Sequence, residues 1–203
     1  MNVVRRSLIA AMGLAPLAAL AQQQRSAALY YELNPPQPVE SPNKIEVLEF
    51  FWYGCIHCYN LEPKLETWLK TLPNDVEFRR VPAVFSPRWG QDAAIFYAFE
   101  ALGLLEKLHQ PFFDAIHRDR LRSDNPQQLS AWLEKHGVDA KKFRATVESF
   151  GVQGKVRRAE RLTAVYKIDG TPAMAVQGRY TVGSSEGMLD TVNQLLGVVR
   201  KNK

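Results

Sequence analysis

The sequence predicts an α/β fold built from a strand–helix–strand half and a strand–strand–helix half, with a helical subdomain inserted between them. Residues 45–51 form an almost continuous apolar run that stops at a turn and leads into a helical pattern. This pattern is typical of a buried parallel strand followed by its crossover helix. The stretch between Pro82 and Pro172 shows only helical spacing of apolar residues. A hairpin pattern and a last helix follow it, so the insertion divides one sheet.

The N-terminal segment is typical of a secretion signal. Arg5 and Arg6 precede the apolar stretch 7–20, which ends in an A-x-A cleavage site at 19–21. The stretch is shorter than the about 20 apolar residues of a membrane span. A twin-arginine route is the alternative to general secretion. We expect the mature chain to begin at Gln22 and to reside in an oxidising compartment, which for a bacterial signal is the periplasm.

Composition and charge narrow the class of protein. The chain has 203 residues, 46% of them hydrophobic, and a formal net charge of +5 that falls to +3 without Arg5 and Arg6. Acidic residues are spread among the basic ones, so no nucleic-acid partner is expected. The length and the hydrophobic content fit one domain with a large insertion.

The first half is expected to begin with a short edge strand near 30–33, followed by a proline-rich extended connection. The central strand covers 45–51, and a helix runs from Cys55 to about Thr71 with leucines on one face. Residues 76–81 form the next strand, which Pro82 ends. The crossover between these two parallel strands should be right-handed.

Start and stop signals divide the insertion into several helices, and a hairpin and a helix complete the sheet. We expect helices over 92–105, beyond Leu108 with a possible break at Pro111, from Asn125-Pro126 to Gly137, from Asp139 to near Gly151, and over about 152–166, then strands 173–176 and 179–182 and a last helix capped by Ser184 or Ser185.

Cys55 and Cys58 are the only cysteines. Three residues apart at the start of a helix, their Cβ atoms lie about 5 to 6 Å apart, so a rotamer change can interconvert dithiol and disulfide. A disulfide that closes so short a loop adds little stability, which favours a redox switch over a structural bridge. Zinc would need further ligands, and Tyr59 after Cys58 excludes a C-x-x-C-H haem attachment. No metal and no cofactor is expected.

The surroundings of the pair indicate how it would react. Cys55 lies at a helix N-terminus, where free N–H groups and the helix dipole favour a thiolate. His57 adds a donor or a positive charge, and such sites lower a cysteine pKa to roughly 3.5–7.5; the alternative is a plain surface histidine. Glu49 interrupts a buried strand, so we expect a raised pKa or a partner and proton exchange with Cys58. The alternative is a glutamate at the strand edge that reaches water.

The order of these elements looks like a thioredoxin fold with a helical insertion. With the signal and the Cys-x-His-Cys motif, the chain resembles the DsbA family of periplasmic thiol:disulfide oxidoreductases over nearly all of its mature length. The matching residues are Leu48-Glu49-Phe50-Phe51, Cys55, His57, Cys58, Tyr59, Glu62 and Thr171-Pro172. Ile56 departs from the pattern, because the best-known members have proline there.

The resemblance assigns roles to these residues. It implies that Cys55, Cys58 and His57 are catalytic and that Glu49 and, more weakly, Glu62 relay protons. It further implies that Pro172 is cis and faces the disulfide, and that the backbone of Thr171 pairs with an extended substrate segment.

The resemblance also implies an oxidase. The Cys55–Cys58 disulfide would pass to unfolded exported proteins with free thiols, and a quinone-linked membrane oxidase of the DsbB type would restore it. A monomer is expected. The alternatives are a disulfide isomerase or reductase of the same fold, or a non-enzymatic polypeptide-binding chaperone. The expected division is a signal peptide over 1–21, a thioredoxin domain over 22–82 and 152–203, and the helical insertion over about 83–151.

Overall fold

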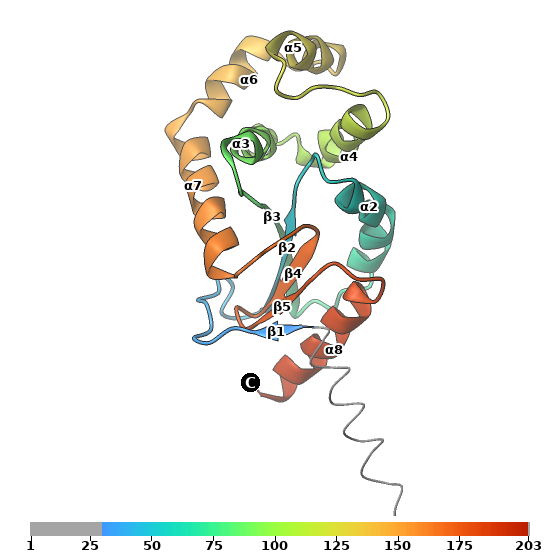
Figure 1. Cartoon of the computed structure of the whole chain (residues 1–203), viewed down its shortest axis with the longest axis vertical. Coiled ribbons are helices and arrows are strands. Elements are labelled where there is room, and N and C mark those ends of the chain that lie inside the picture. The colour runs from blue at the N-terminus through green and yellow to red at the C-terminus, as the bar shows by residue number, and fades with distance from the viewer. Residues whose placement is uncertain (1–29, 203) are drawn as a thin grey trace, which may run out of the picture.

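The computed structural model describes residues 30–202. It contains one mixed sheet with strands in the order β1-β5-β4-β2-β3, and helices cover the sheet and extend beyond it (Figure 1). The strands are β1 (Tyr31–Glu32), β2 (Ile45–Phe51), β3 (Val76–Pro82), β4 (Ala173–Val176) and β5 (Tyr180–Val182). The expected α/β fold with a helical insertion is confirmed. The expected signal segment lies outside the described residues.

Strand β2 is the centre of the sheet. It pairs in parallel with β3 and antiparallel with β4, and all seven of its residues are buried. Helix α2 (Ile56–Leu69) connects β2 to β3. Because parallel strands are covered on both faces, the near-continuous apolar sequence of β2 follows from its position. Helix α2 therefore begins just beyond the buried C-terminal end of this central strand.

The two faces of the sheet are covered by different helices (Figure 1). Helices α2 and α8 (Met188–Lys201) pack on one face, where Val47, Leu65 and Val192 belong to one apolar cluster. Helix α7 (Phe150–Val165) packs on the other face, where Phe50 contacts the ring of Tyr166 just after the helix. Among residues 30–202 no helix is long and apolar enough to cross a membrane.

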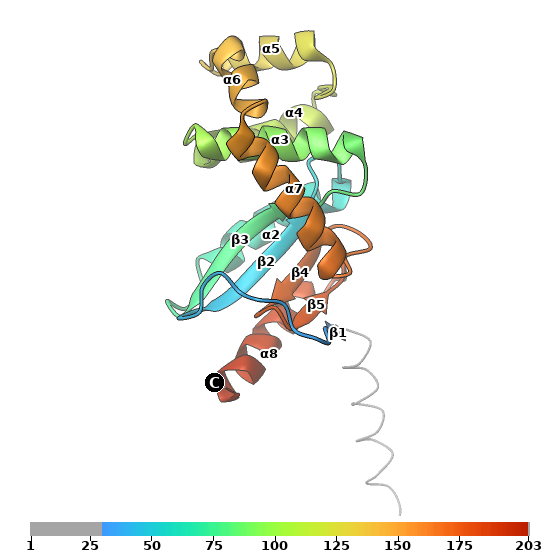
Figure 2. The same ribbon diagram turned by 90° about the vertical axis from the view of Figure 1, so that its left-hand side faces the viewer.

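The inserted helices lie beyond the end of the sheet (Figure 2). They are α3 (Pro87–Ala101), α4 (Leu105–His117), α5 (Pro126–Lys135) and α6 (Ala140–Val147), after which α7 returns to the sheet. Asn125 and Asp139 cap α5 and α6 through their side chains, as predicted. The division of the chain at residues 82 and 151 into domain parts stays a prediction.

Several predicted helix ends are wrong. Helix α3 begins at Pro87 after Ser86 rather than at residue 92, because proline is well placed at the first helical position. Helix α7 begins at Phe150, with Ser149 as its side-chain cap. Neither Ser184 nor Ser185 caps α8, which begins at Met188 after a turn.

Helix α4 runs through Pro111 without the expected break. Phe112 and Phe113, the two residues after the proline, are fully buried. Their packing compensates for the backbone hydrogen bond that the helix loses at the proline.

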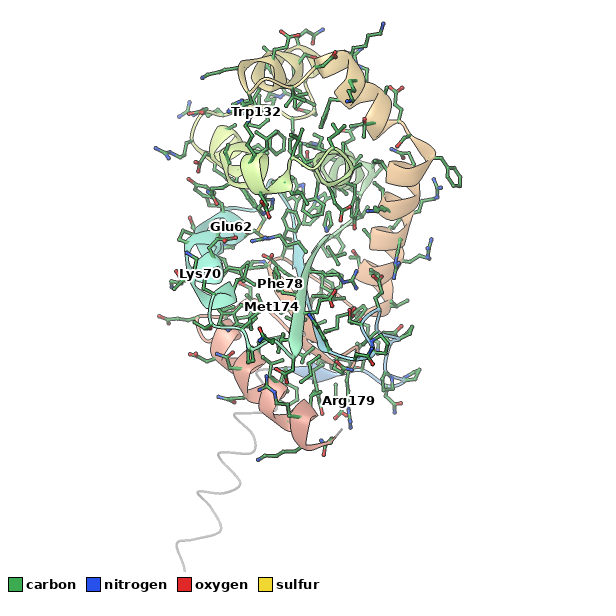
Figure 3. All side chains as sticks on the ribbon, turned by 180° about the vertical axis from the view of Figure 1, so that it is seen from behind. Glu62, Lys70, Phe78, Trp132, Met174 and Arg179 are labelled. Carbon is green, nitrogen blue, oxygen red and sulfur yellow. The ribbon has the colours of Figure 1, made fainter. Side chains whose placement is uncertain are left out.

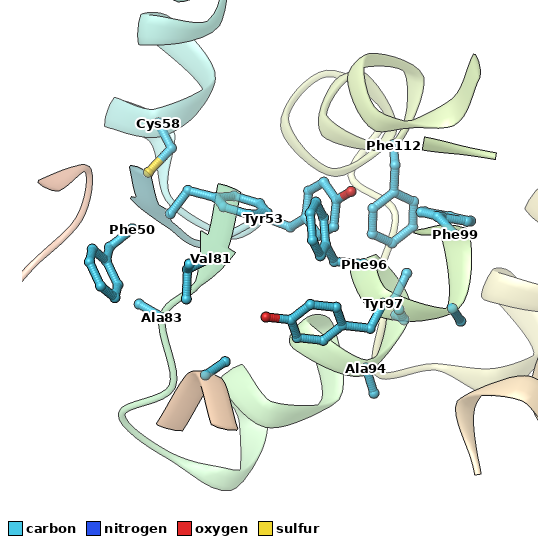
Figure 4. Packing of buried hydrophobic residues seen from close by; sticks show 14 of the residues in the cluster. Phe50, Tyr53, Cys58, Val81, Ala83, Ala94, Phe96, Tyr97, Phe99 and Phe112 are labelled. Carbon is cyan, nitrogen blue, oxygen red and sulfur yellow. The ribbon is translucent and has the colours of Figure 1, made fainter. Parts of the chain in front are cut away.

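One apolar cluster joins the sheet to the insertion. Figure 4 shows its continuity: Phe50 and Cys58 lie at one end, Phe99 and Phe112 lie at the other, and Tyr53 and Phe96 lie between them. The segment that links β2 to α2 runs through the middle of this cluster. The insertion therefore takes part in fixing the position of the two cysteines.

Candidate active site

The sulfur of Cys55 caps helix α2. After β2 the chain makes a turn in which the Cys55 N–H donates to the Trp52 carbonyl over 2.9 Å. Cys55 is the N-cap residue with extended backbone angles, and its Sγ accepts a hydrogen bond from the Cys58 backbone N–H at 3.4 Å. Both cysteines are free thiols; Cys55 is half-buried and Cys58 has no exposed surface. The site thus presents one sulfur and hides the other.

The two thiols have opposite acidities. A hydrogen bond from the Cys58 side chain is the largest cause that lowers the pKa of Cys55 to about 5. Burial works against this shift, while the Thr171 side chain and the backbone N–H groups of Cys58 and His57 add to it. Burial raises the pKa of Cys58 far above its ordinary value, and the neighbouring Cys55 sulfur raises it further. At neutral pH the pair therefore holds one thiolate, on Cys55, and one thiol, on Cys58.

The loop before β4 contacts the reactive sulfur. The Thr171-Pro172 peptide bond is cis, and the Thr171 carbonyl oxygen lies 3.3 Å from Cys55 Sγ. The carbonyl oxygen accepts a hydrogen bond from the Cys55 thiol and so favours the protonated form, whereas the Thr171 side chain favours the thiolate. The hydrogen bond from Cys58 is the largest effect, so the thiolate is favoured overall. Ala173 pairs with Phe50 across the sheet, which places this loop beside the end of β2.

His57 is exposed at the start of α2. Its backbone N–H is among the groups that lower the pKa of Cys55. The shift is accounted for by hydrogen bonds from Cys58, Thr171 and the His57 backbone and not by the imidazole. A catalytic role for the imidazole stays a prediction.

Glu49 is buried beneath the pair. Its side chain has no exposed surface, and its Oε2 lies 3.2 Å from Nε of Arg80, the residue beside it in the β2–β3 register. The contact has the distance of an ion pair but not the direction of a hydrogen bond. Burial raises the pKa of Glu49 to about 8, and the charge of Glu62 adds to this. The carboxyl is therefore mostly protonated at pH 7 and lies close enough to Cys58 to affect its pKa.

Glu62 is the ionised partner of Glu49. It is 1% exposed, and its Oε2 accepts a hydrogen bond from Arg80 at 3.0 Å. The same guanidinium nitrogen of Arg80 also lies 3.0 Å from Glu66, which is exposed. Burial raises the pKa of Glu62, but His109 and Arg80 outweigh burial, so the net shift is downward. The two buried carboxyls share one cation, and their single proton lies on Glu49.

Arg80 is a residue of the site that was not predicted from the sequence. A signal for it existed, because a buried glutamate in a central strand needs a cation. In a parallel pair whose register matches Ile45 with Val76, Arg80 lies beside Glu49. The prediction that Glu49 has a raised pKa or a partner describes both features of this arrangement, while its role in proton exchange stays a proposal.

Helix α3 holds the turn before Cys55 through an indole ring. Trp52 stacks on Trp89 with ring centroids 4.2 Å apart and an interplanar angle of 13°. Its Nε1–H donates to the buried carboxylate of Asp92 over 2.8 Å. A Cβ at Gly54 would lie 2.3 Å from the Trp52 ring, so only glycine allows the indole to lie against the backbone next to Cys55. Asp92 and Gly54 are supporting residues that the sequence analysis missed.

Two exposed apolar side chains lie near the turn that leads to Cys55: Ile56 follows Cys55 in the chain, and Phe85 is joined to Trp52 of this turn through the ring of Trp89. Ile56 is 48% exposed, and Phe85, 44% exposed, contacts the ring of Trp89 edge-on.

A thioredoxin-type sheet that presents an N-capping cysteine thiolate, hides its partner thiol and places a cis-proline loop against the reactive sulfur defines a thiol:disulfide oxidoreductase. Comparisons with known proteins agree with this class. The family described as DSBA-like thioredoxin domain matches residues 90–196. The DsbA thiol:disulfide interchange protein of Azotobacter vinelandii is 42% identical over 80% of this chain and 77% of its own. That of Pseudomonas aeruginosa is 35% identical over 100% and 97%.

The fold agrees as well. The crystal structure of the oxidoreductase DsbA from Xylella fastidiosa has a TM-score of 0.80 and 31% identity, covering 85% of this chain and 96% of that one. The chain belongs to the DsbA family of thiol:disulfide interchange proteins, and it is a protein disulfide oxidoreductase.

Proposed function

We propose that the protein is a periplasmic oxidase that donates its Cys55–Cys58 disulfide to newly exported, unfolded proteins with free thiols. The observation that carries this proposal is the asymmetry of the two sulfurs. The half-buried Cys55 has a pKa of about 5, whereas the fully buried Cys58 has a strongly raised pKa. In a disulfide between these two sulfurs a nucleophile can reach only Cys55, so the bond breaks with Cys58 as the leaving group.

The first exchange step consumes the enzyme disulfide. A substrate thiolate attacks Cys55 Sγ, the Cys55–Cys58 bond breaks, and its electron pair leaves on Cys58. Because the Cys58 thiolate is buried and basic, it takes a proton at once. Glu49, protonated at neutral pH, is the nearby acid that supplies this proton. Glu49 then recovers a proton from solvent by way of its neighbour Glu62.

The second step releases an oxidised substrate. A second substrate thiolate attacks the substrate sulfur of the mixed disulfide, and Cys55 leaves as a thiolate; the substrate has lost two electrons and the enzyme has gained them. A fall of the Cys55 pKa from 9.0 to about 5 favours this thiolate at pH 7 by at most about 100-fold. That corresponds to about 60 mV, and solvent screening at the half-exposed sulfur reduces the figure.

The surface around Cys55 supports a polypeptide substrate. The backbone of Thr171, which contacts Cys55 Sγ, offers an edge to which an extended segment can add by strand pairing, and Ile56 next to Cys55 and the exposed Phe85 offer apolar surface. A quinone-linked membrane oxidase of the DsbB type reoxidises the reduced enzyme to the Cys55–Cys58 disulfide. The protein acts as a monomer in the periplasm, to which the N-terminal signal directs it.

Trapping of mixed disulfides tests the roles of the two cysteines. Cys58→Ser keeps the exposed nucleophile but removes the thiol that resolves a mixed disulfide from within. We expect non-reducing gels of periplasmic and membrane extracts to show reducible high-mass bands that contain this variant. One of these bands should contain the membrane reoxidant.

Cys55→Ser is the matched control, because its remaining thiol has no exposed surface; it should give few bands or none. The reverse pattern would contradict the assignment of Cys55 as the nucleophile. An absence of bands from both variants would favour a non-enzymatic polypeptide-binding protein. A glutathione redox equilibrium close to that of thioredoxin would favour a reductase.

A further inference from the structure

A buried histidine beside the two carboxyls has no part in the exchange steps above. His109, from α4, is 7% exposed and lies among the aromatic rings of β2, α3 and α4. Its Nδ1 lies 2.9 Å from the hydroxyl oxygen of Tyr53. Its Nε2 lies 3.5 Å from Oε1 of Glu62. The ring therefore connects the segment before Cys55 to the ionised member of the acid pair.

The tautomer of His109 follows from its partners. Burial raises the pKa of Tyr53 well above its ordinary value, so the hydroxyl stays protonated. Nδ1 of His109 is the one acceptor that the described residues offer it, so the hydroxyl donates its hydrogen bond to Nδ1. Burial lowers the pKa of His109, so the ring is neutral at pH 7 and carries its one proton on Nε2. Tyr53 thus selects the tautomer that directs an N–H group at Glu62.

We infer that His109, held by Tyr53, is a positioning residue for the proton step: its Nε2–H faces the Glu62 carboxylate and keeps the proton of the buried pair on Glu49. At 3.5 Å the contact is longer than an ordinary N–H···O bond. However, His109 Nε2 and Glu62 Oε1 have no other hydrogen-bond partner in the described part of the chain. Burying a polar atom without a partner costs free energy. The contact between these two atoms reduces this cost, which favours the observed orientation of both side chains.

The charged and titratable groups that face His109 come from three elements. They are Glu62 and Glu66 of α2, Arg80 of β3 and Tyr53 of the preceding turn; the glutamates raise the pKa of His109 and Arg80 lowers it. Glu66 is exposed and paired with Arg80. Glu62 is therefore the carboxylate that a change at His109 affects first.

A cavity of about 940 Å³ makes the orientation of Glu62 important. Its lining includes Glu62, Arg80 and His109 but neither Glu49 nor Cys58. Seen from behind, Glu62 lies where α2 approaches α4 (Figure 3). The acid pair thus borders this cavity through Glu62, although Glu62 is buried, and Glu49 lies away from the cavity wall. An ionised Glu62 leaves the stored proton on the inner carboxyl, next to Cys58.

The inference rests on the proposed proton step at Cys58, but it can be tested without any exchange reaction. The reduced full mature chain, with ¹³C-labelled glutamate carboxyls, is titrated by NMR, and Glu49→Gln and Glu62→Gln assign the two signals. The wild-type Glu49 signal should titrate near pH 8. In His109→Leu the Glu62 carboxylate loses its donor. The Glu62 midpoint should rise by about 0.5 to 1 pH unit, while the Glu49 midpoint should not fall, because Glu49 titrates when Glu62 is already ionised.

Three further variants complete the test. Tyr53→Phe keeps the ring and should raise the Glu62 midpoint by less, which preserves the test if His109→Leu does not fold. His109→Gln retains an N–H donor and should restore midpoints close to the wild type. Gln110→Ala, the next residue of α4 and part of the same cavity wall, should change neither.

A Glu62 midpoint that is unchanged or lowered in both His109→Leu and Tyr53→Phe would overturn the inference. These midpoints report the position of the carboxyls whether or not Glu49 serves Cys58. The trapping of mixed disulfides reports the exchange reaction alone, so failure of the proposed function is recognised separately.

Discussion

Arg80→Met is expected to lower the free energy of unfolding of the reduced protein by about 3 kcal/mol at pH 7. Glu49 is already mostly protonated at this pH, so the loss falls on Glu62. Without the guanidinium, Glu62 must take a proton in the folded state, at pH 7 and against an ordinary pKa of 4.5. Each pH unit between these values is worth about 1.4 kcal/mol. Urea unfolding at pH 7 and pH 5 measures the loss.

The sign of the pH dependence follows from Glu62. In the wild type its pKa is lowered, so its contribution to stability is present above pH 4.5 and is lost as pH falls. In Arg80→Met the penalty should therefore shrink to about 1 kcal/mol at pH 5. Arg200→Met is the matched control, because Arg200 pairs with Asp75 on the surface; it should cost less than about 1 kcal/mol at both pH values. Equal losses for the two variants would contradict a buried, shared cation.

The reduced protein is expected to gain about 2 kcal/mol of stability relative to the oxidised protein between pH 4 and pH 7. Only the reduced form has a Cys55 thiolate, whose pKa is lowered to about 5. A group with a lowered pKa contributes stability above its unfolded pKa and loses it as pH falls through the folded value. The full difference at pH 7 would be about 2.7 kcal/mol, and the half-exposed position of the sulfur reduces it.

Urea unfolding of both redox forms across this pH range measures the change. Groups such as Glu49 titrate in both forms, so their effects cancel in the difference. Cys55→Ala, which can form neither a thiolate at this position nor a disulfide, should follow the pH dependence of the oxidised protein. Stability curves of the oxidised and reduced wild type that run parallel from pH 4 to pH 7 would contradict a stabilised thiolate.

The parts of the site that the sequence predicted are local. Cys55 and Cys58 lie within one helical turn, and Glu49 belongs to the same strand–turn–helix unit, so spacing alone places them. Thr171-Pro172 is distant in sequence, and the resemblance to a family located it. The beginning of α3 was predicted late because apolar spacing starts near residue 92, although Ser86-Pro87 is a sufficient start signal.

The remainder of the site depends on tertiary contacts. Arg80 reaches two carboxyls from β3, and His109 meets Glu62 only because α4 packs across α2. Tyr53 looks like an ordinary core residue in the sequence, and its hydrogen bond to His109 joins residues 56 positions apart. No periodic pattern indicates such pairs. Composition and spacing therefore identify the redox pair, while the groups that set its proton chemistry require the structure.

The pH dependence of Cys55 alkylation in the reduced protein tests the central claim most directly. Iodoacetamide reacts with thiolates, and the buried Cys58 thiol is protected from it. We expect a single rapid alkylation at Cys55 whose rate rises with a midpoint near pH 5 and is constant by pH 7. A midpoint near the ordinary cysteine value of about 8.5, or alkylation of Cys58 at a comparable rate, would contradict it.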